Sequence, residues 1–174
     1  MSDVASRAGV GQASLYRRYR TKSELLNAVC ADGMQSITDA AESALDEGKD
    51  AGDAFAEFMV HYVESGAGAQ QILAGSFVAD ESLFDLAKRL YDRTQQVIDR
   101  AIAAGAVRPD VSASDIWLLA AQLSSLRSAD PQRDRELRLR YLAVILDGLR
   151  PSVGGTLAGV PPDFVELQRR WRSE

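Results

Sequence analysis

The sequence contains few of the residues from which enzymes and metal sites are built. Its 174 residues include one histidine, His61, and one cysteine, Cys30. A single histidine excludes a two-histidine metal site, and a single cysteine excludes an internal disulfide framework. The G-x-S-x-G segment of many hydrolases and the P-loop of nucleotide-binding proteins are also missing. We therefore expect no enzymatic activity, no cofactor and no metal ion.

Long apolar stretches are missing as well. No run of apolar residues is long enough to span a bilayer, and no charged-then-apolar leader is found, so we expect a cytoplasmic protein. Apolar residues still make up 46% of the chain, which is enough for a core. A length of 174 residues fits one domain, or a small domain fused to a larger one.

Helical periodicity recurs along the whole chain, whereas strand alternation, hairpin signals and internal repeats are absent. The predicted fold class is therefore all-α. We expect a helix from Asp80 or Ser82 to Ala104, and others over residues 2–8, 12–19, 21–47, 54–65, 70–79, 113–127, 131–149 and 161–172.

The first 25 residues are typical of a helix-turn-helix that runs into a long helix. Gly9 ends the first short helix because glycine accepts the left-handed conformation of such a turn. Two short helices joined by a Gly-containing turn place the second helix in a DNA major groove. Thr21 and Glu24 form the T-x-x-E pattern of a capping box, which begins the next helix.

The charge distribution favours DNA binding at the same end. Residues 1–25 hold five basic and two acidic side chains, a net charge of +3, within a chain whose net charge is −5. The remaining residues hold fifteen basic and 23 acidic side chains, a net charge of −8. A basic end on an acidic protein is typical of a phosphate-binding surface, although a solvated basic face with no partner has the same composition.

This segment resembles the tetracycline-repressor (TetR) family of bacterial transcriptional regulators. The resemblance depends on A-S-R-A-G-V-G-Q-A-S-L-Y-R-R-Y-R-T-K-S-E-L-L, residues 5–26. It implies an N-terminal helix-turn-helix followed by a helical ligand-binding and dimerisation bundle. We place the first unit at residues 1–30 and the second at residues 31–174. The family also has a further helix before this segment, so either the protein starts upstream of Met1 or this scaffold element is lacking.

The side chains of the second helix and of the start of the next one divide by chemistry into two groups of DNA contacts. Ser14, Tyr16 and Lys22 suit phosphate oxygens, and they match positions that the family uses on the DNA backbone. Gln12 and Arg17 are long enough to reach base edges, and Ala13 permits close approach to a thymine methyl. Leu15 and Tyr19 are expected in the core. Arg18 and Arg20 fit a phosphate contact and a solvated charge equally well.

Aromatic residues from several helices suggest a small-molecule site in the larger unit. An apolar cleft with a few polar groups is the usual form of such a site. We expect an apolar or aromatic effector, although an ordinary aromatic core explains any single residue as well. The candidate lining residues are Phe58, His61, Tyr62, Phe77, Tyr91 and Gln95.

Two helices near the C-terminus have more apolar surface than one core requires. Residues 116–126 are apolar nearly all round, and residues 137–149 carry two apolar stripes. A helix with two apolar faces buries both, so we expect a homodimer, although a helix central to one subunit is the alternative for residues 116–126. The resemblance also implies pairing through these helices. The expected interface residues are Trp117, Leu123, Leu142, Leu146 and Leu149.

Together these features predict a ligand-responsive DNA-binding transcriptional regulator, with repression of a palindromic operator as the expected role. The alternative is a helical small-molecule-binding or scaffolding dimer without DNA activity in this form.

Overall fold

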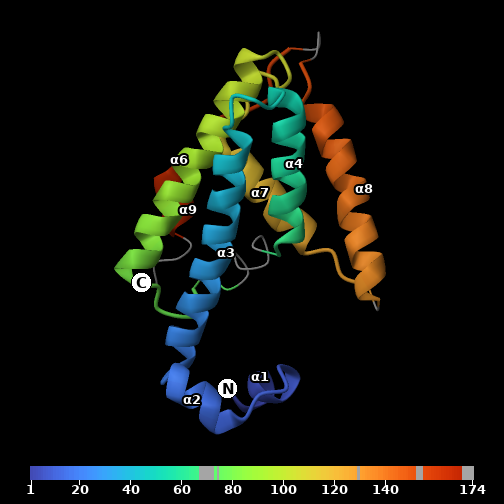
Figure 1. Ribbon diagram of the computed structural model, residues 1–174. Helices are drawn as coiled ribbons and strands as arrows, with labels where there is room; N and C mark the ends of the chain where they lie inside the picture. The colour runs from blue at the N-terminus through green and yellow to red at the C-terminus, as the bar shows by residue number, and fades with distance from the viewer. Residues whose placement is uncertain (67–72, 74, 129, 152–154, 170–174) are drawn as a thin grey trace.

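The computed structural model describes residues 1–66, 73, 75–128, 130–151 and 155–169, and within them every regular element is a helix. This confirms the all-α prediction. Figure 1 shows a helical bundle with a small head, residues 1–21, projecting from one end. The long helix α3 joins the two parts (Figure 1). None of the described helices is both long and apolar enough to cross a membrane.

The head is a helix-turn-helix with a very small core. Its helices are α1 (Ser2–Arg7) and α2 (Gln12–Arg18), and they contact each other. Gly9 has φ +65° in the turn between them, as the sequence predicted, a conformation that favours glycine. Ala5 is the one fully buried side chain in the two helices, whereas Val10 in the turn is 45% exposed. The head is therefore held by little apolar burial.

Helix α3 (Lys22–Ala44) begins at a cap that differs in one detail from the prediction. Thr21 Oγ1 accepts a hydrogen bond from the Glu24 N–H at 3.1 Å, as a capping box requires. The Glu24 carboxylate, however, accepts from the N–H of Arg20 at 2.7 Å and not from that of Thr21. The reciprocal bond therefore fixes the end of the turn that leads from α2 into α3.

The bundle is built around α3, which packs between α4 (Ala51–Glu64) and α6 (Glu81–Ala103). Helix α7 (Ala113–Ser124) contacts α4, α6 and α8, and α8 (Pro131–Leu149) lies at the outer side beyond α4 (Figure 1). The short helix α9 (Phe164–Arg169) lies behind α6 in this view. Fully buried side chains from α3, α4, α6, α7 and α8 form the core, among them Ile37, Phe58, Ile98, Ile116 and Leu142.

Side-chain caps explain why four bundle helices begin where they do. Each capping side chain accepts a hydrogen bond from a backbone N–H in the first turn of its helix, an interaction that stabilises a helix by about 1 kcal/mol. The capping residues are Asp50 for α4, Asp80 for α6, Ser112 for α7 and Asp130 for α8. Of the two caps considered for the helix ending near Ala104, the structure has Asp80.

Two expected helices differ from the structure or extend beyond it. Residues 70–72 and 74 of the helix expected over 70–79 lie outside the described residues, and residues 75–77 form a turn and bends, with Gly75 at φ +76°. The C-terminal helix was expected to reach Arg172. Its described part ends at Arg169, and residues 170–174 lie outside the described residues.

Candidate DNA-binding interface and ligand site

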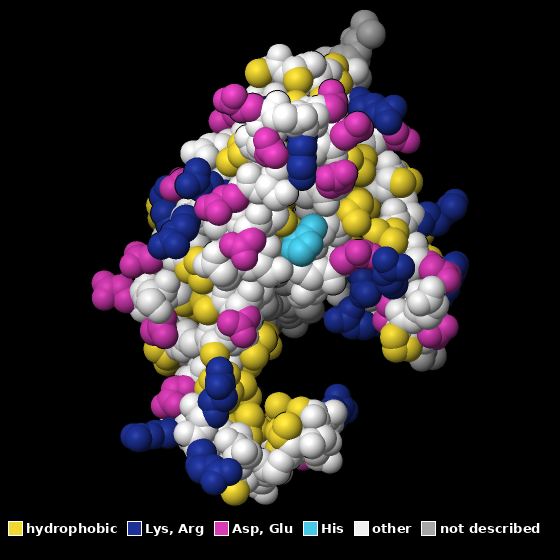
Figure 2. All heavy atoms as spheres, viewed as in Figure 1, with side chains coloured by type: hydrophobic (Ala, Val, Ile, Leu, Met, Phe, Trp, Pro, Cys, Tyr) yellow, Lys and Arg dark blue, Asp and Glu magenta, His cyan; other side chains and the backbone are white. Residues whose placement is uncertain are grey.

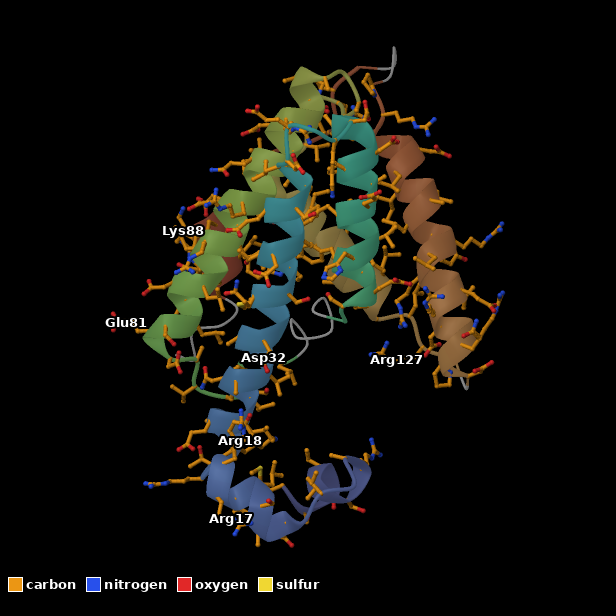
Figure 3. The ribbon with its side chains drawn as sticks, viewed as in Figure 1. Arg17, Arg18, Asp32, Glu81, Lys88 and Arg127 are labelled. Atoms are coloured by element: carbon orange, nitrogen blue, oxygen red, sulfur yellow. The ribbon has the colours of Figure 1, made fainter. Side chains whose placement is uncertain are left out.

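The outer face of α2 carries the side chains expected to meet DNA. Arg17 points away from the bundle, at the far end of the head (Figure 3). Its Nη2 donates a hydrogen bond to Ser14 Oγ at 3.3 Å, which holds the guanidinium over this face. Every predicted DNA-contact residue is accessible: Gln12, Ala13, Ser14, Tyr16, Arg17 and Lys22 are all exposed. Their individual DNA contacts remain predictions.

Arg18 lies on the opposite side of α2, next to the start of α3 (Figure 3). Its Nε donates to the Tyr19 hydroxyl at 3.1 Å, and its guanidinium lies 5.6 Å from the centre of the Tyr19 ring. The hydrogen bond to Tyr19 raises the pKa of Arg18. Leu15 and Tyr19, expected in the core, are only partly buried. Tyr19 therefore helps to position Arg18 at the junction between the head and α3.

The residues predicted to line one ligand pocket converge only in part, because Phe58 and His61 border the same groove. Phe58 and Tyr62 are buried in the core, with their rings edge-to-face at a centroid distance of 5.8 Å. Burial raises the pKa of Tyr62. Phe77 is also a core residue. Tyr62 and Phe77 therefore fit the alternative of an ordinary aromatic core, whereas Phe58 also borders the groove that His61 lines.

Tyr91 and Gln95 have structural partners on another side of the molecule. The Tyr91 ring packs against Phe164 of α9, with centroids 4.9 Å apart. Gln95 Oε1 accepts a hydrogen bond from the N–H of Ala113 at 2.9 Å, so this side chain supports the beginning of α7. Neither residue lines the groove that His61 borders.

His61 is exposed on the face of the bundle shown in Figure 2, where it is the cyan side chain. Its Nε2 lies 3.0 Å from Ser36 Oγ, a hydrogen bond that joins α4 to α3. His61 and Ser36 border an open groove of about 490 Å³ that is also lined by Asp39, Lys49 and Glu57. No three metal-ligating side chains are grouped to hold a metal ion in the described part of the chain.

A small apolar cavity lies in a place that the sequence did not indicate. It is enclosed by α3, α6, α7 and α9, and Trp117 forms part of its wall. Trp117 was predicted at the dimer interface but is half-buried beside this cavity. Its position in the middle of an all-apolar helix gave no indication of which helix it faces.

Asn27 links α3 to the segment before α6 and was also missed. Its Nδ2 donates to the carbonyl of Val78 at 3.0 Å, and its Oδ1 accepts from the N–H of Asp80 at 3.1 Å. The same amide donates to the Ser23 carbonyl within α3. In the sequence, the position of the polar Asn27 beside the apolar Leu26 and near Cys30 is the signal that indicates a buried or bridging role. Cys30 is buried, and burial raises its pKa to about 11, as expected for a packing residue.

The two apolar stripes of α8 have different surroundings. Leu142 is 1% exposed, and Leu149 is also buried in the core of its own subunit, as is Leu123 of α7. These three interface predictions need correction, because the side chains have no surface to offer a partner. Leu146 is partly buried against the same core. The stripe that faces outward contains Tyr141, 47% exposed, and Val144, 63% exposed.

Comparison with known protein families supports the interpretation of both parts. Residues 1–29 match the family described as bacterial regulatory proteins, tetR family. Residues 50–151 match the C-terminal domain of SbtR-like transcriptional regulators, which covers more than half of the chain. The chain belongs to the TetR family. The head is therefore the DNA-binding part of a TetR-family transcriptional regulator.

Solved TetR-family structures share this fold. The regulator SCO0520 from Streptomyces coelicolor is 26% identical, with 86% of each chain covered and a TM-score of 0.63. A TetR-family protein from Rhodococcus RHA1 is 20% identical, with 87% of this chain and 86% of that chain covered and a TM-score of 0.61. The ketosteroid regulator KstR2 of Mycobacterium tuberculosis is 18% identical, with 86% and 84% covered and a TM-score of 0.59. Among curated proteins, no sequence matches the chain.

Proposed function

We propose that this TetR-family regulator is a ligand-responsive repressor that binds a palindromic operator as a homodimer in the cytoplasm. The observation that carries the proposal is the exposed basic face of α2, held by α3 at a distance from the bundle (Figure 1). Residues 1–30 are the proposed DNA-binding unit, and residues 31–174 are the proposed ligand-binding and dimerisation unit. Because α3 continues through residue 30, a change in its tilt within the bundle moves the head.

Within the head, the proposed roles follow the chemistry of each side chain. Ser14, Tyr16 and Lys22 donate to phosphate oxygens and position α2 on the duplex. Gln12 and Arg17 donate to base edges in the major groove, and Ala13 lets the helix approach closely. The exposure of all six side chains supports these roles.

The proposed dimer forms through the outward stripe of α8 and the neighbouring surface of α7. Tyr141 and Val144 are the exposed members of this stripe. The stripe also contains Leu137 and Ile145, of which Ile145 is partly buried against the subunit core, and the opposite stripe is occupied by that core. A two-fold dimer would place two copies of α2 on successive major grooves, and this is the reason for expecting a palindromic operator.

The proposed effector is an apolar or aromatic small molecule that binds in the bundle. It acts by binding more tightly to the dimer geometry in which the two copies of α2 no longer match the operator. The factor by which the effector lowers the affinity for DNA is then set by the ratio of the effector affinities for the two dimer geometries.

The experiment is a reporter assay combined with DNA binding by the purified protein. The operator is first obtained by selecting bound duplexes from a random pool, and it is then placed upstream of a reporter gene. We expect the protein to lower reporter expression, and Arg17→Ala to restore it. An increase in expression would identify an activator. Absence of any selected DNA would favour the alternative of a helical scaffolding or small-molecule-binding dimer.

A further inference from the structure

Helix α9 packs onto the bundle through one face and leaves the other in solvent. Leu167 is 5% exposed, whereas Val165 on the same helix is 55% exposed. Phe164 packs on Tyr91 of α6, and the Lys88 ammonium lies 5.8 Å from the centre of the Phe164 ring. Figure 3 shows Lys88 on the outer side of α6, where α9 passes behind it.

The inward face of α9 closes the apolar cavity. Gln168 contributes its wall on the α9 side, and the remaining walls are apolar. The space left is about 10 Å³, which holds no molecule larger than one water. The other lining residues are Met34 of α3, Ala79, Leu83, Phe84 and Ala87 at or near the start of α6, and Trp117 of α7.

Among the described contacts, α9 is attached to the bundle by the Phe164 ring on Tyr91, by the Lys88 ammonium over that ring and by the buried Leu167. A helix of six residues is unstable alone, so its stability depends on this packing and on a local capping box. In that box, Asp163 Oδ1 accepts from the Glu166 N–H at 2.8 Å, and the Glu166 carboxylate accepts from the Asp163 N–H at 2.9 Å. Both bonds move with the helix. They do not attach it to the bundle.

The chain just before α9 is attached to the bundle separately. The N–H of Leu157 donates to Asp110 Oδ2 at 2.5 Å, and Arg108 Nη2 donates to the Gly155 carbonyl at 2.8 Å. Between this anchor and α9 lie Gly159, with φ +86°, and the pair Pro161-Pro162. This arrangement allows α9 to leave its seat while residues 155–157 stay bound.

We propose that the cavity beneath α9 is a binding site for a neutral, flat apolar molecule, and that α9 is a lid which this molecule displaces. No charged side chain lines the cavity, which excludes a stable pairing with an ionic ligand. The aromatic walls, Phe84 and Trp117, favour a flat ligand. The proposal rests on the ligand response proposed above and names where that ligand binds.

The position of the cavity connects it to the head. Met34 belongs to α3, the helix that carries the head, and Ala79 and Leu83 flank Asp80, whose N–H is bonded to Asn27 of α3. A molecule that enlarges the cavity pushes α3 away from the start of α6. The resulting tilt changes the position of α2 relative to the bundle.

The test uses the full-length chain and the neutral fluorescent probe N-phenyl-1-naphthylamine. Trp171 is replaced by Phe, so that Trp117 is the single tryptophan and its energy transfer to the probe reports binding at the cavity. Leu167→Ala weakens the seat of α9, and Val165→Ala on the exposed face is the matched control. We expect Leu167→Ala to bind the probe at least tenfold more tightly than the control, because the fraction of open protein rises.

Two further measurements separate a lid from general unfolding. The helical circular dichroism and the unfolding midpoint of the bundle should be nearly the same in both variants. Adding Ala87→Leu to Leu167→Ala should remove the tighter binding by filling the cavity wall. Equal probe affinity in Leu167→Ala and Val165→Ala, or persistence of tight binding after Ala87→Leu, would overturn the proposal.

DNA release is measured separately from probe binding. Tight probe binding to Leu167→Ala without any change in DNA affinity would support the lid and contradict the proposed ligand response. A ligand that releases DNA equally well from both variants would support the ligand response and contradict the lid.

Discussion

The side-chain carbonyl oxygen of Asn27 accepts a hydrogen bond from the backbone N–H of Asp80 at 3.1 Å, and this bond joins the helix that carries the DNA-binding head to the cap of α6. The Asn27 amide donates in turn to the carbonyl of Val78 at 3.0 Å. Any displacement of the start of α6 is therefore transmitted directly to the lower part of α3. Such a connection is required if events in the bundle are to change DNA affinity.

The first prediction concerns this connection. Asn27→Ala removes these two bonds and the bond to the Ser23 carbonyl within α3, and we expect it to lower the free energy of unfolding by about 1–2 kcal/mol. It should also reduce the effect of an effector on DNA affinity, while DNA affinity without effector stays close to that of the wild type. Gln35→Ala is the control, because the Gln35 side chain bonds only to Asp39 on the same helix among the described contacts. Equal effector responses in the two variants would show that Asn27 carries no coupling.

The second prediction separates phosphate contacts from base contacts. Lys22→Ala should weaken binding to all DNA sequences alike and lower the slope of log affinity against log salt concentration by about one. Arg17→Ala should instead relax the preference at one base position, at a cost of roughly 1–3 kcal/mol for the preferred operator. Binding isotherms over a salt series on the operator and its single-base variants measure both effects. If Lys22→Ala changed the base preference and left the overall affinity unchanged, the roles assigned to Lys22 and Arg17 would be wrong.

The third prediction concerns the two stripes of α8. Val144→Arg should prevent dimerisation and leave the subunit folded, since this side chain is largely exposed in a single chain. Leu142→Arg should instead unfold the subunit, because it places a charge in the core at a cost of roughly 4 kcal/mol or more. Sedimentation and circular dichroism distinguish the two outcomes. A dimeric Val144→Arg variant would mean that the chains pair through another surface.

Most of the fold was predictable because helix boundaries are set by local chemistry. Asp130 and Pro131 fix the first turn of α8, and Ser112 fixes that of α7, as their sequence positions indicated. The choice between the two stripes of α8 was not predictable. Leu142 and Val144 belong to different stripes of similar hydropathy, and only the packing against α4 and α7 decides which one is buried.

The proposed DNA contacts were easier to place from the sequence than the proposed ligand site. Gln12 to Arg17 lie on one short helix, so helical periodicity alone indicates which side chains turn inward, such as Leu15, and which stay exposed. A cavity between helices depends on how distant segments pack, and periodicity carries no information about that. Tyr91 and Gln95 illustrate the difference, since the first packs on Phe164 and the second supports the start of α7.

The fourth prediction concerns the stability of the head. Only Ala5 is fully buried in α1 and α2, so local opening of the head exposes little apolar surface. We expect the amides of residues 2–19 to exchange faster than those of α4, which has six buried residues. Hydrogen exchange followed by mass spectrometry resolves the two segments. Similar protection in both would indicate that the head is stabilised by a contact with another chain or segment.

The fifth prediction is a pH dependence at the anchor of the C-terminal segment. The Arg108 guanidinium, together with the Leu157 N–H, lowers the pKa of Asp110 to about 2. Because the folded pKa lies below the ordinary value near 3.9, the stabilisation is complete above about pH 4 and is lost as the pH falls toward 2. Asp110→Asn should therefore unfold at a lower temperature than the wild type at pH 7, and the difference should shrink below pH 4. A difference that is constant from pH 7 to pH 2.5 would contradict this assignment.

The most direct test of the account is the footprint of the protein on DNA selected from a random pool. We expect two chains per duplex and protection of two inverted half-sites, with centres about one helical turn, roughly 10 bp, or a multiple of it apart. The Arg17→Ala variant should no longer protect these half-sites. The Val144→Arg variant should no longer protect both half-sites together. Selection of no sequence above the starting pool, or protection of a single half-site by a monomer, would contradict the central claim that this chain is a dimeric DNA-binding repressor.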